Sequence, residues 1–447
     1  MKSHHSKVRR TATVAATGLA MTLALAACAP SAGGGASSGT ADDIEAALQE
    51  KSTITVWGWA PQLDDLAAGF EKEYPNVTVE VVNAGTGNDQ YIKLQNAIKA
   101  GSGGPDVAQI EYYAMPQFGL ADALVDLTDF GFADFEDDFT ASTWNSVSLD
   151  GGIYALPQDS GPMAMFYNKT VFDSLGLAVP TTWDEYIAAA NTIHAANPNA
   201  YITNDTGDAG FTTSMIWQAG GEPYSTDGTD VTIDLQDEGS KKFADMWSQL
   251  TENDLVAPIS SWSDEWYKGL ADGTIATLNI GAWMPGNLES GVPSASGNWR
   301  VATLPTYDGT PASSENGGSA DAVLEGSDNK LVAAGFVQWM NQGAGAQISI
   351  DGGGFPSTTA DLESDEFLNY ESEYFGGQKI NEVFAQSIDD NVEGWSYLPY
   401  QVYANSIFGD TVGQSYSTKT NLNSGLESWE KASADYGNDQ GFTVTAK

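Results

Sequence analysis

The sequence predicts an α/β protein of two domains, built on parallel-rich sheets flanked by helices. Its 447 residues are more than one ordinary hydrophobic core holds. Residues 53–110 alternate between strand-like and helix-like patterns, which is the order of a parallel sheet with helices on both faces. In Gly151–Gly176, two apolar runs flank a short polar segment next to Pro157 and Pro162. Because proline cannot donate a hydrogen bond to a sheet, we expect this segment to cross between the domains.

The N-terminus has the pattern of a signal peptide over residues 1–27. Basic residues precede the apolar run Val14–Ala27, and Cys28, the only cysteine, follows it. This order resembles a bacterial lipobox, in which the cysteine carries a lipid, and an ordinary signal-peptidase site is the alternative. Residues 28–51 are then a lipid-anchored flexible tether, rich in glycine and serine. We expect the protein to be held by its lipid on the extracellular face of the membrane of a Gram-positive bacterium.

Acidic residues dominate the composition. Removal of the signal peptide leaves 14 Lys and Arg against 60 Asp and Glu, a net charge of about −46. Nucleic acid and phosphorylated ligands are therefore disfavoured, since phosphate contacts need Lys and Arg. We interpret the charge as a solvated surface, and attraction of a cationic ligand is the alternative. His194 is the only histidine outside the signal peptide, so we expect no metal site and no cofactor.

The first half of the chain predicts the contact loops of a parallel sheet. Its elements are strands Thr53–Trp57, Val77–Val82 and Asp106–Ile110 and helices Leu63–Tyr74 and Gln90–Ala100. Ligands of such sheets lie at the carboxyl ends of the strands. The loops Trp57–Pro61 and Glu111–Met115 are therefore the predicted contact loops.

The second half adds helices, glycine-rich loops and two strands. Thr181 or Thr182 caps a helix that continues through Tyr186–Ala196, with acidic residues in its first turn. The other expected elements are helices Phe211–Ala219, Asp237–Thr251, Asp264–Ala271 and Asn329–Met340 and strands Thr274–Ile280 and Val301–Pro305.

A series of motifs along the chain carries a family resemblance. In order they are Thr55-Val56-Trp57, Phe70-Glu71-x-x-Tyr74-Pro75, Gly104-Pro105-Asp106-Val107, Gly152-Ile153-Tyr154-Ala155-Leu156-Pro157, Tyr167-Asn168-Lys169, Pro180-x-Thr182-Trp183-Asp184-Glu185, Gly273-x-Ile275-Ala276-x-Leu278-x-Ile280-Gly281-x-Trp283 and Leu304-Pro305. Each motif is weak alone, but their order and spacing resemble the extracellular solute-binding proteins of carbohydrate ABC importers, the maltose-binding-protein-like family. The sequence Ile110-Glu111-Tyr112-Tyr113 departs from the family pattern after the third strand.

The resemblance implies a two-lobed periplasmic-binding-protein-like fold with three interdomain crossings. The crossings are expected near Asp159–Gly161, Ala302–Pro305 and Met340–Gly343, so that lobe one is 52–159 plus 306–340 and lobe two is 161–301 plus 343–447. It further implies a monomer that closes by hinge motion on a neutral sugar, an oligosaccharide, and delivers it to ABC transporter permease subunits.

Four candidate ligand residues follow the first and third strands. A sugar offers hydroxyls to polar side chains and C–H faces to aromatic rings. Trp57 and Trp59 flank Gly58 on one face, so one is expected in the core and the other, Trp59, in the cleft. Glu111 is the expected hydroxyl acceptor and Tyr113 a stacking ring.

Three further candidates lie in the first expected crossing or just after the second. Asp159 is either a ligand acid, as the resemblance implies, or a hinge residue that forms the turn. Gly317 and Gly318 let the backbone approach a ligand closely.

Three tryptophans complete the candidate list. Trp283 matches a sugar-stacking tryptophan of the family, and Trp395 lies at about the place of another stacking aromatic. Trp217 precedes Gly220-Gly221, and its helical spacing fits core packing equally well.

Two alternative functions remain open from the sequence. A secreted glycosidase would need two carboxylates about 5–10 Å apart, and no such pair is singled out, so we expect no enzymatic turnover. A binding protein for a cationic solute such as a polyamine is suggested by the acidity alone.

Overall fold

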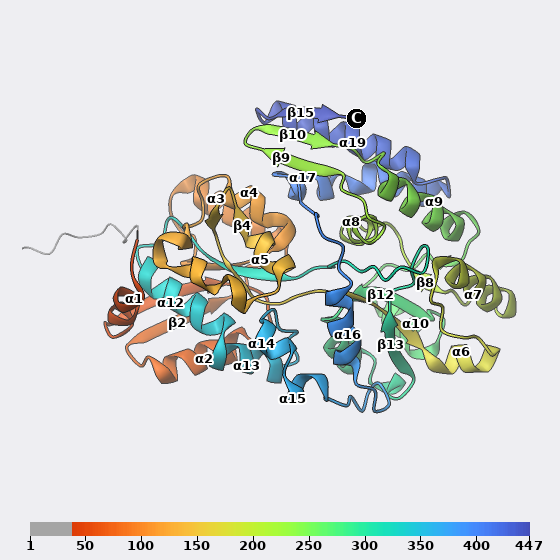
Figure 1. The fold of residues 1–447 in the computed structure, drawn as a ribbon, viewed down its shortest axis with the longest axis horizontal. Coiled ribbons are helices and arrows are strands. Elements are labelled where there is room, and N and C mark those ends of the chain that lie inside the picture. Colours follow the sequence, from red (N-terminus) through yellow and green to blue (C-terminus); the bar gives the residue numbers. More distant parts are fainter. Residues whose placement is uncertain (1–37) are drawn as a thin grey trace, which may run out of the picture. The chain divides into compact units, whose positions relative to one another are not determined.

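A five-stranded sheet forms the centre of the first half of the fold (Figure 1). The computed structural model describes residues 38–447. The sheet contains β1 (Ser52–Trp57), β2 (Val77–Val82), β3 (Val107–Glu111), β6 (Leu156–Pro157) and β14 (Ser319–Val323). The order is β2-β1-β3-β14-β6, with β1 parallel to β2 and β3 and with β14 antiparallel to β3 and β6. The predicted series of strand, helix, strand, helix and strand is therefore confirmed.

Helices cover this sheet because their apolar residues recur at helical spacing. α2 buries Leu63, Leu66, Ala67 and Phe70 towards the sheet. The helices of this half are α2 (Leu63–Glu73), α3 (Asn88–Ala100), α4 (Met115–Gly119), α5 (Ala141–Val147), α12 (Lys330–Asn341) and α13 (Gly343–Asp351), with 3-10 turns η1 (Tyr112–Ala114), η2 (Leu127–Phe130) and η3 (Phe132–Asp138). The first apolar run of Gly151–Gly176 contributes to two short strands: β5 (Gly152–Ile153) pairs with β4 (Ser148–Leu149), and β6 joins the large sheet.

The end of the expected tether forms helix α1 (Ala41–Leu48). Thr40 caps this helix in a capping box with Asp43. Ile44 and Leu48 are buried, and the helix lies beside α12 (Figure 1). The last part of the expected tether is thus helical, because Ile44 and Leu48 recur at helical spacing and form a face that can be buried. The signal peptide and the lipidation site at Cys28 lie outside the described residues.

The second half is built on an antiparallel sheet, β12-β7-β13, which differs from the expected parallel pairing. Its strands are β7 (Met163–Asn168), β12 (Thr277–Gly281) and β13 (Trp299–Thr303). β7 starts at the first crossing and runs away from it, whereas β12 and β13 run back, so that Gly281 pairs with Met163 and Thr303 with Ala164. This arrangement brings the carboxyl ends of β12 and β13 to the crossings.

Smaller sheets and many helices complete the second half. β8 (Thr203–Asn204) pairs with β11 (Val256–Ala257), and β10 (Asp230–Ile233) lies between β9 (Tyr224–Asp227) and β15 (Thr443–Ala446). The helices are α6 (Lys169–Leu175), α7 (Trp183–Ala196), α8 (Ala209–Gln218), α9 (Glu238–Glu252), α10 (Asp264–Asp272), α11 (Met284–Gly291), α14 (Thr359–Leu362), α15 (Asp365–Leu368), α16 (Ile380–Asp389), α17 (Gln401–Ser406), α18 (Val412–Thr418) and α19 (Asn423–Asp439), with η4 (Pro293–Ala295) and η5 (Phe408–Asp410). Thr182 caps α7, as one of the two predicted choices.

Residues 158–162, which we call the first crossing, join the two sheets, and the expected lobe boundaries remain predictions. Thr306 still bridges to Thr182 of the second half, so we define the second crossing as residues 315–319. α13 packs on α2 and α12 of the first half, and Thr358 bridges to Phe139. Residues 343–358 therefore lie with the first sheet, because the apolar contacts of α12 continue into the next helix. We call residues 390–399, between α16 and α17, the junction segment.

Candidate functional site

A cluster of aromatic rings surrounds one carboxylate at the carboxyl ends of β1 and β3. We call Trp59, Tyr91, Glu111 and Tyr113 the strand-end group. The Tyr91 hydroxyl donates to Glu111 Oε2 over 3.0 Å and accepts from the Glu111 backbone N–H over 2.8 Å. The Tyr91 ring contacts Trp59 and Tyr113 edge-on, at centroid distances of 6.3 and 6.1 Å. The two predicted contact loops are thus brought together by the parallel sheet.

Glu111 is a carboxylate poised to accept hydrogen bonds. Burial raises its pKa, hydrogen bonds from Tyr113 and Tyr91 oppose the rise, and the Asp208 carboxylate adds to it. The backbone of Gly87 (φ +54°) lies so close that a Cβ there would be 3.1 Å from Glu111 Oε2. Asp208 is exposed at the N-cap of α8, so acidic groups from both halves act on one position.

Trp57 and Trp59 do not separate into core and cleft as expected. Both are half-buried and both pack against the first hydrophobic core. Gln109 Oε1 accepts from the backbone N–H groups of Trp59 and Ala60, over 2.8 and 3.0 Å, and so fixes the loop after β1. Trp59 touches Tyr91, and its ligand role remains a prediction.

Asp159 links the first and second crossings. Its Oδ1 accepts from the Ser319 N–H over 2.6 Å, and its carbonyl accepts from the Tyr112 hydroxyl over 2.7 Å. Burial raises its pKa to about 7; the Ser319 hydrogen bond opposes this rise, and the Glu111 and Glu315 carboxylates add to it. These contacts join the two crossings, and both expected roles of Asp159, hinge residue and ligand acid, remain predictions.

Glu315 holds three chain segments together, and sequence reasoning missed it. Its carboxylate accepts from the Gly161 N–H (2.6 Å), the Asn391 side-chain amide (2.9 Å) and the Ser142 hydroxyl (3.1 Å), with Ser160 at 3.3–3.4 Å. It is 4% exposed, and burial raises its pKa against these hydrogen bonds. An isolated acid in a loop of Gly and Ser has no periodic pattern, so no sequence signal marked it.

The two candidate glycines of the second crossing lie close to different aromatic side chains. Gly318 (φ +87°) is buried, and a Cβ there would be 2.6 Å from Tyr112 Cε2. Its close approach is therefore to Tyr112 of η1. Gly317 (φ +77°) is exposed beside Trp283, whose Nε1 would lie 3.0 Å from a Cβ at residue 317. Close approach of either glycine to a ligand remains a prediction.

Trp283 lies against the second crossing, as the antiparallel sheet requires. Its Nε1 donates to the Asn316 carbonyl over 2.7 Å. The indole is half-buried and stacks on Trp262, with centroids 5.9 Å apart and planes at 27°. Sugar stacking on Trp283 remains a prediction.

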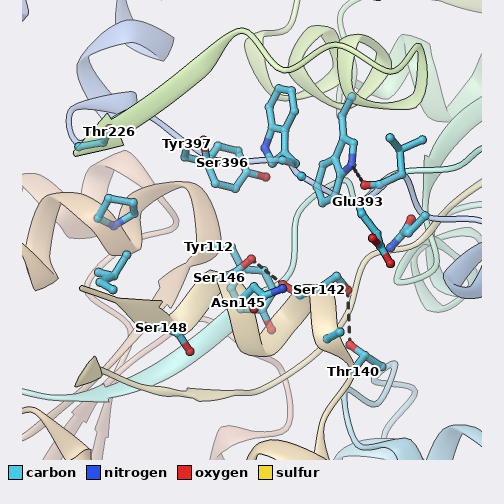
Figure 2. A pocket seen from close by; sticks show the side chains of 18 of the residues that line it. Tyr112, Thr140, Ser142, Asn145, Ser146, Ser148, Thr226, Glu393, Ser396 and Tyr397 are labelled. Carbon is cyan, nitrogen blue, oxygen red and sulfur yellow. Dashed lines mark hydrogen bonds between the residues drawn. The ribbon is translucent and has the colours of Figure 1, made fainter. Parts of the chain in front are cut away.

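A cavity of about 810 Å³ lies between α5 and the junction segment (Figure 2). Trp217 and Trp395 line it and stack at 5.3 Å with planes at 5°, and Tyr397 meets Trp395 edge-on at 5.7 Å. The Trp217 Nε1 donates to the Val392 carbonyl, and Trp217 is 6% exposed, so it is both a packed and a cavity-lining residue. Polar residues of α5 line the same cavity (Figure 2); they are Ser142, Asn145 and Ser146.

The predicted residues therefore fall into three places. The strand-end group contains Trp59, Glu111 and Tyr113, and Trp57 lies beside it. The cavity takes Trp217 and Trp395. The crossings take Asp159, Gly317 and Gly318, with Trp283 against them. Within residues 38–447, no cluster of three metal-binding side chains was found, and no helix has the length and apolarity needed to cross a membrane.

Comparison with known proteins places this geometry in a family. The model of the bacterial extracellular solute-binding proteins matches residues 57–347. A solved binding protein of Bifidobacterium animalis subsp. lactis, in complex with β-1,6-galactobiose, is 46% identical, with a TM-score of 0.82 over 89% of this chain and all of that one. The galacto-N-biose/lacto-N-biose I-binding protein of Bifidobacterium longum is 26% identical, with a TM-score of 0.78 over 88% and 98% of the chains.

A curated relative agrees with these structures. The lactose-binding protein of Rhizobium radiobacter is 26% identical over 354 residues, which are 74% of this chain and 81% of that protein. The two-lobed α/β fold is confirmed by these similarities, and the three similar proteins are named for or solved with sugars. The chain belongs to the bacterial extracellular solute-binding proteins, in the carbohydrate-binding class that serves ABC importers.

Proposed function

We propose that the protein captures a galactose-containing disaccharide or short oligosaccharide and delivers it to its ABC permease. β-1,6-Galactobiose is the first candidate, because the protein in complex with that sugar shares 46% of its residues with this chain. The names of two further relatives, the lacto-N-biose- and lactose-binding proteins, also contain a galactosyl sugar. The ligand would be neutral, which agrees with the scarcity of Lys and Arg.

The observation that carries the proposal is Glu111 within its aromatic surround. A carboxylate accepts hydrogen bonds from two neighbouring hydroxyls, and aromatic faces cover the C–H surface of a pyranose ring. Trp59 and Tyr113 supply rings beside Glu111, and Asp208 supplies a second acceptor from the other half. A ligand bridging Glu111 and Asp208 would gain contacts from both halves, which is what favours a closed state.

We propose lobe boundaries that follow the observed contacts. Lobe one would contain the five-stranded sheet with α12 and α13, and lobe two the β12-β7-β13 sheet with the C-terminal helices. The hinge would be made by residues 158–162 and 315–319 and by a third crossing after Thr358. Hydrogen bonds of Glu315 and Asp159 between these segments support this assignment.

We also propose that the mature protein is a lipid-anchored monomer. Cys28 follows the apolar run of the signal peptide and would be the lipidated residue. Mass spectrometry of the mature N-terminus should find a diacylated or triacylated Cys28, and Cys28→Ala should release the protein from the membrane fraction. An unmodified N-terminus at another residue would contradict the anchor. Sedimentation equilibrium of the soluble domain should give the monomer mass.

Calorimetric titration tests the sugar. Wild-type protein should bind β-1,6-galactobiose, and should bind maltose and spermidine more weakly. Glu111→Gln should lose between about 10- and 100-fold in affinity, because hydrogen bonds to a charged acceptor are the stronger ones. Glu80→Gln, an exposed acid on β2, is the matched control and should bind normally. Spermidine binding without sugar binding would overturn the proposal, and release of galactose on incubation would show an enzyme.

A further inference from the structure

Trp262 has a backbone conformation that tryptophan rarely adopts. Its φ is +66°, and it is half exposed, at 50%. Within residues 38–447 the other non-glycine residues with positive φ are Asp122, Asp150, Asp254 and Lys419. Aspartate tolerates this region, whereas a bulky aromatic residue there is an outlier. Such strain persists only where the surroundings impose it, and it is common at ligand-binding positions.

The neighbours of Trp262 impose this conformation. The Asn204 amide donates to the Ile259 carbonyl over 3.1 Å and to the Ser261 hydroxyl over 2.9 Å. On the other side, Ser263 caps α10 by accepting from the Trp266 N–H over 3.2 Å. The Trp266 Nε1 in turn donates to Asn204 Oδ1 over 2.8 Å. The loop is therefore fixed before and after Trp262, and its ring is held in place without a ligand.

The Trp262 ring extends a row of tryptophans from the core to solvent. Trp266, 1% exposed, lies 4.9 Å from it, and Trp283 stacks on it at 5.9 Å. Trp283 is bonded to the second crossing through Asn316. Half of the Trp262 ring thus rests on aromatic neighbours, and the other half faces solvent beside the residues that join the two halves of the fold.

We propose that Trp262 is a stacking platform for a pyranose ring of the ligand, one unit beyond the disaccharide. The inference rests on the proposed function and names its substrate class: galactosyl oligosaccharides of three or more units. A rigid, exposed aromatic face binds the C–H surface of a sugar at little cost in conformational entropy. A role limited to covering Trp283 would instead affect ligands of every length alike.

Titration of sugars of two lengths tests the inference. Wild type, Trp262→Phe and Trp262→Ala are titrated with β-1,6-galactobiose and β-1,6-galactotriose. Trp262→Ala should bind the trisaccharide about 5- to 10-fold more weakly and the disaccharide unchanged, since an aromatic stacking contact is of that size. Trp262→Phe should retain most of the trisaccharide affinity. Tyr370→Ala, which removes an equally exposed ring elsewhere, should change neither affinity.

The outcomes separate the two proposals. The platform would be overturned if Trp262→Ala bound the trisaccharide as tightly as wild type does, or if it lost the same affinity for both sugars. Neither result would contradict the proposed binding of galactosides. Failure of the wild-type protein to bind either galactoside would overturn the proposed function, and the platform with it. Trp262→Gly introduces a residue that tolerates positive φ. If this variant loses trisaccharide affinity while its melting temperature is unchanged, the platform is supported and misfolding is excluded as the cause.

Discussion

Replacement of Glu315 by alanine should destabilise the junction between the two halves. The change removes the acceptor of the Gly161 N–H at 2.6 Å, the Asn391 amide at 2.9 Å and the Ser142 hydroxyl at 3.1 Å. Each hydrogen bond to a charged group contributes about 1.5–3 kcal/mol. Water would enter the space left by the side chain and would bond some of these donors. We therefore expect the free energy of unfolding to fall by about 3–5 kcal/mol in total, which is the usual cost of leaving buried partners unpaired.

Differential scanning calorimetry at pH 7 measures this loss. For a chain of this size the melting temperature should fall by about 4–6 °C. Glu315→Gln keeps an oxygen that accepts from Gly161 but turns an amide group towards Asn391. It should therefore lose less stability than Glu315→Ala. Glu80→Ala, an exposed acid on β2, is the control and should stay within about 0.5 kcal/mol of wild type.

The same variants test whether Glu315 joins the hinge segments. Its donors come from the first crossing, α5 and the junction segment. Small-angle scattering without ligand should therefore show a larger radius of gyration for Glu315→Ala than for wild type, because the bonds that restrict the crossings are gone. A Glu315→Ala protein with wild-type stability and scattering would refute the reasoning.

Two further predictions concern the buried acids and the glycines. Burial raises the pKa of Asp159 and of Asp321 to about 7, above the ordinary value of 3.8, so the folded state holds protons that the unfolded chain releases. The contribution of these two groups to stability should therefore be greatest below about pH 4 and fall as pH rises to about 7, by about 1.4 kcal/mol per pH unit for each group. Urea unfolding at pH 5 and 7.5 checks this, and Asp159→Asn should flatten the slope; a steeper slope would contradict it. Gly318→Ala should cost about 2–3 kcal/mol through strain at φ +87° and a clash with Tyr112, whereas Gly220→Ala (φ +82°), with no atom within 4 Å, should cost about 1 kcal/mol. Equal losses in the two variants would show that the contact with Tyr112 is unimportant.

Local patterns predicted the first half of the fold well. The β2 strand over Val77–Val82 has the predicted bounds, and α2 ends one residue before the predicted Tyr74. Alternation and helical spacing arise from the burial of one face, so they can be seen in a single segment. The parallel pairing of these strands follows from the intervening helices, which also brought the loops of Trp59 and Glu111 together.

Long-range pairing could not be predicted in the second half. The antiparallel direction of β12 and β13 depends on where β7 begins, which is a property of the crossing and not of either strand. The later crossings are likewise hard to locate from the sequence, because Thr306 pairs with Thr182 and α13 packs on α2 through contacts distant in sequence.

The contrast between Glu111 and Glu315 shows what sequence reasoning can reach in a binding site. Glu111 follows a buried strand, so its position at the carboxyl end of the sheet follows from the pattern around it. Glu315 is the more deeply buried of the two acids, and its hydrogen-bond partners are residues 142, 160–161 and 391. No local sequence pattern predicts these partners. A buried carboxylate is costly unless it is hydrogen-bonded, and the donors of Glu315 offset that cost while they join distant segments of the chain. The residues that would contact a ligand can therefore be proposed from strand ends and aromatic pairs, whereas those that join the crossings are found only from the folded contacts.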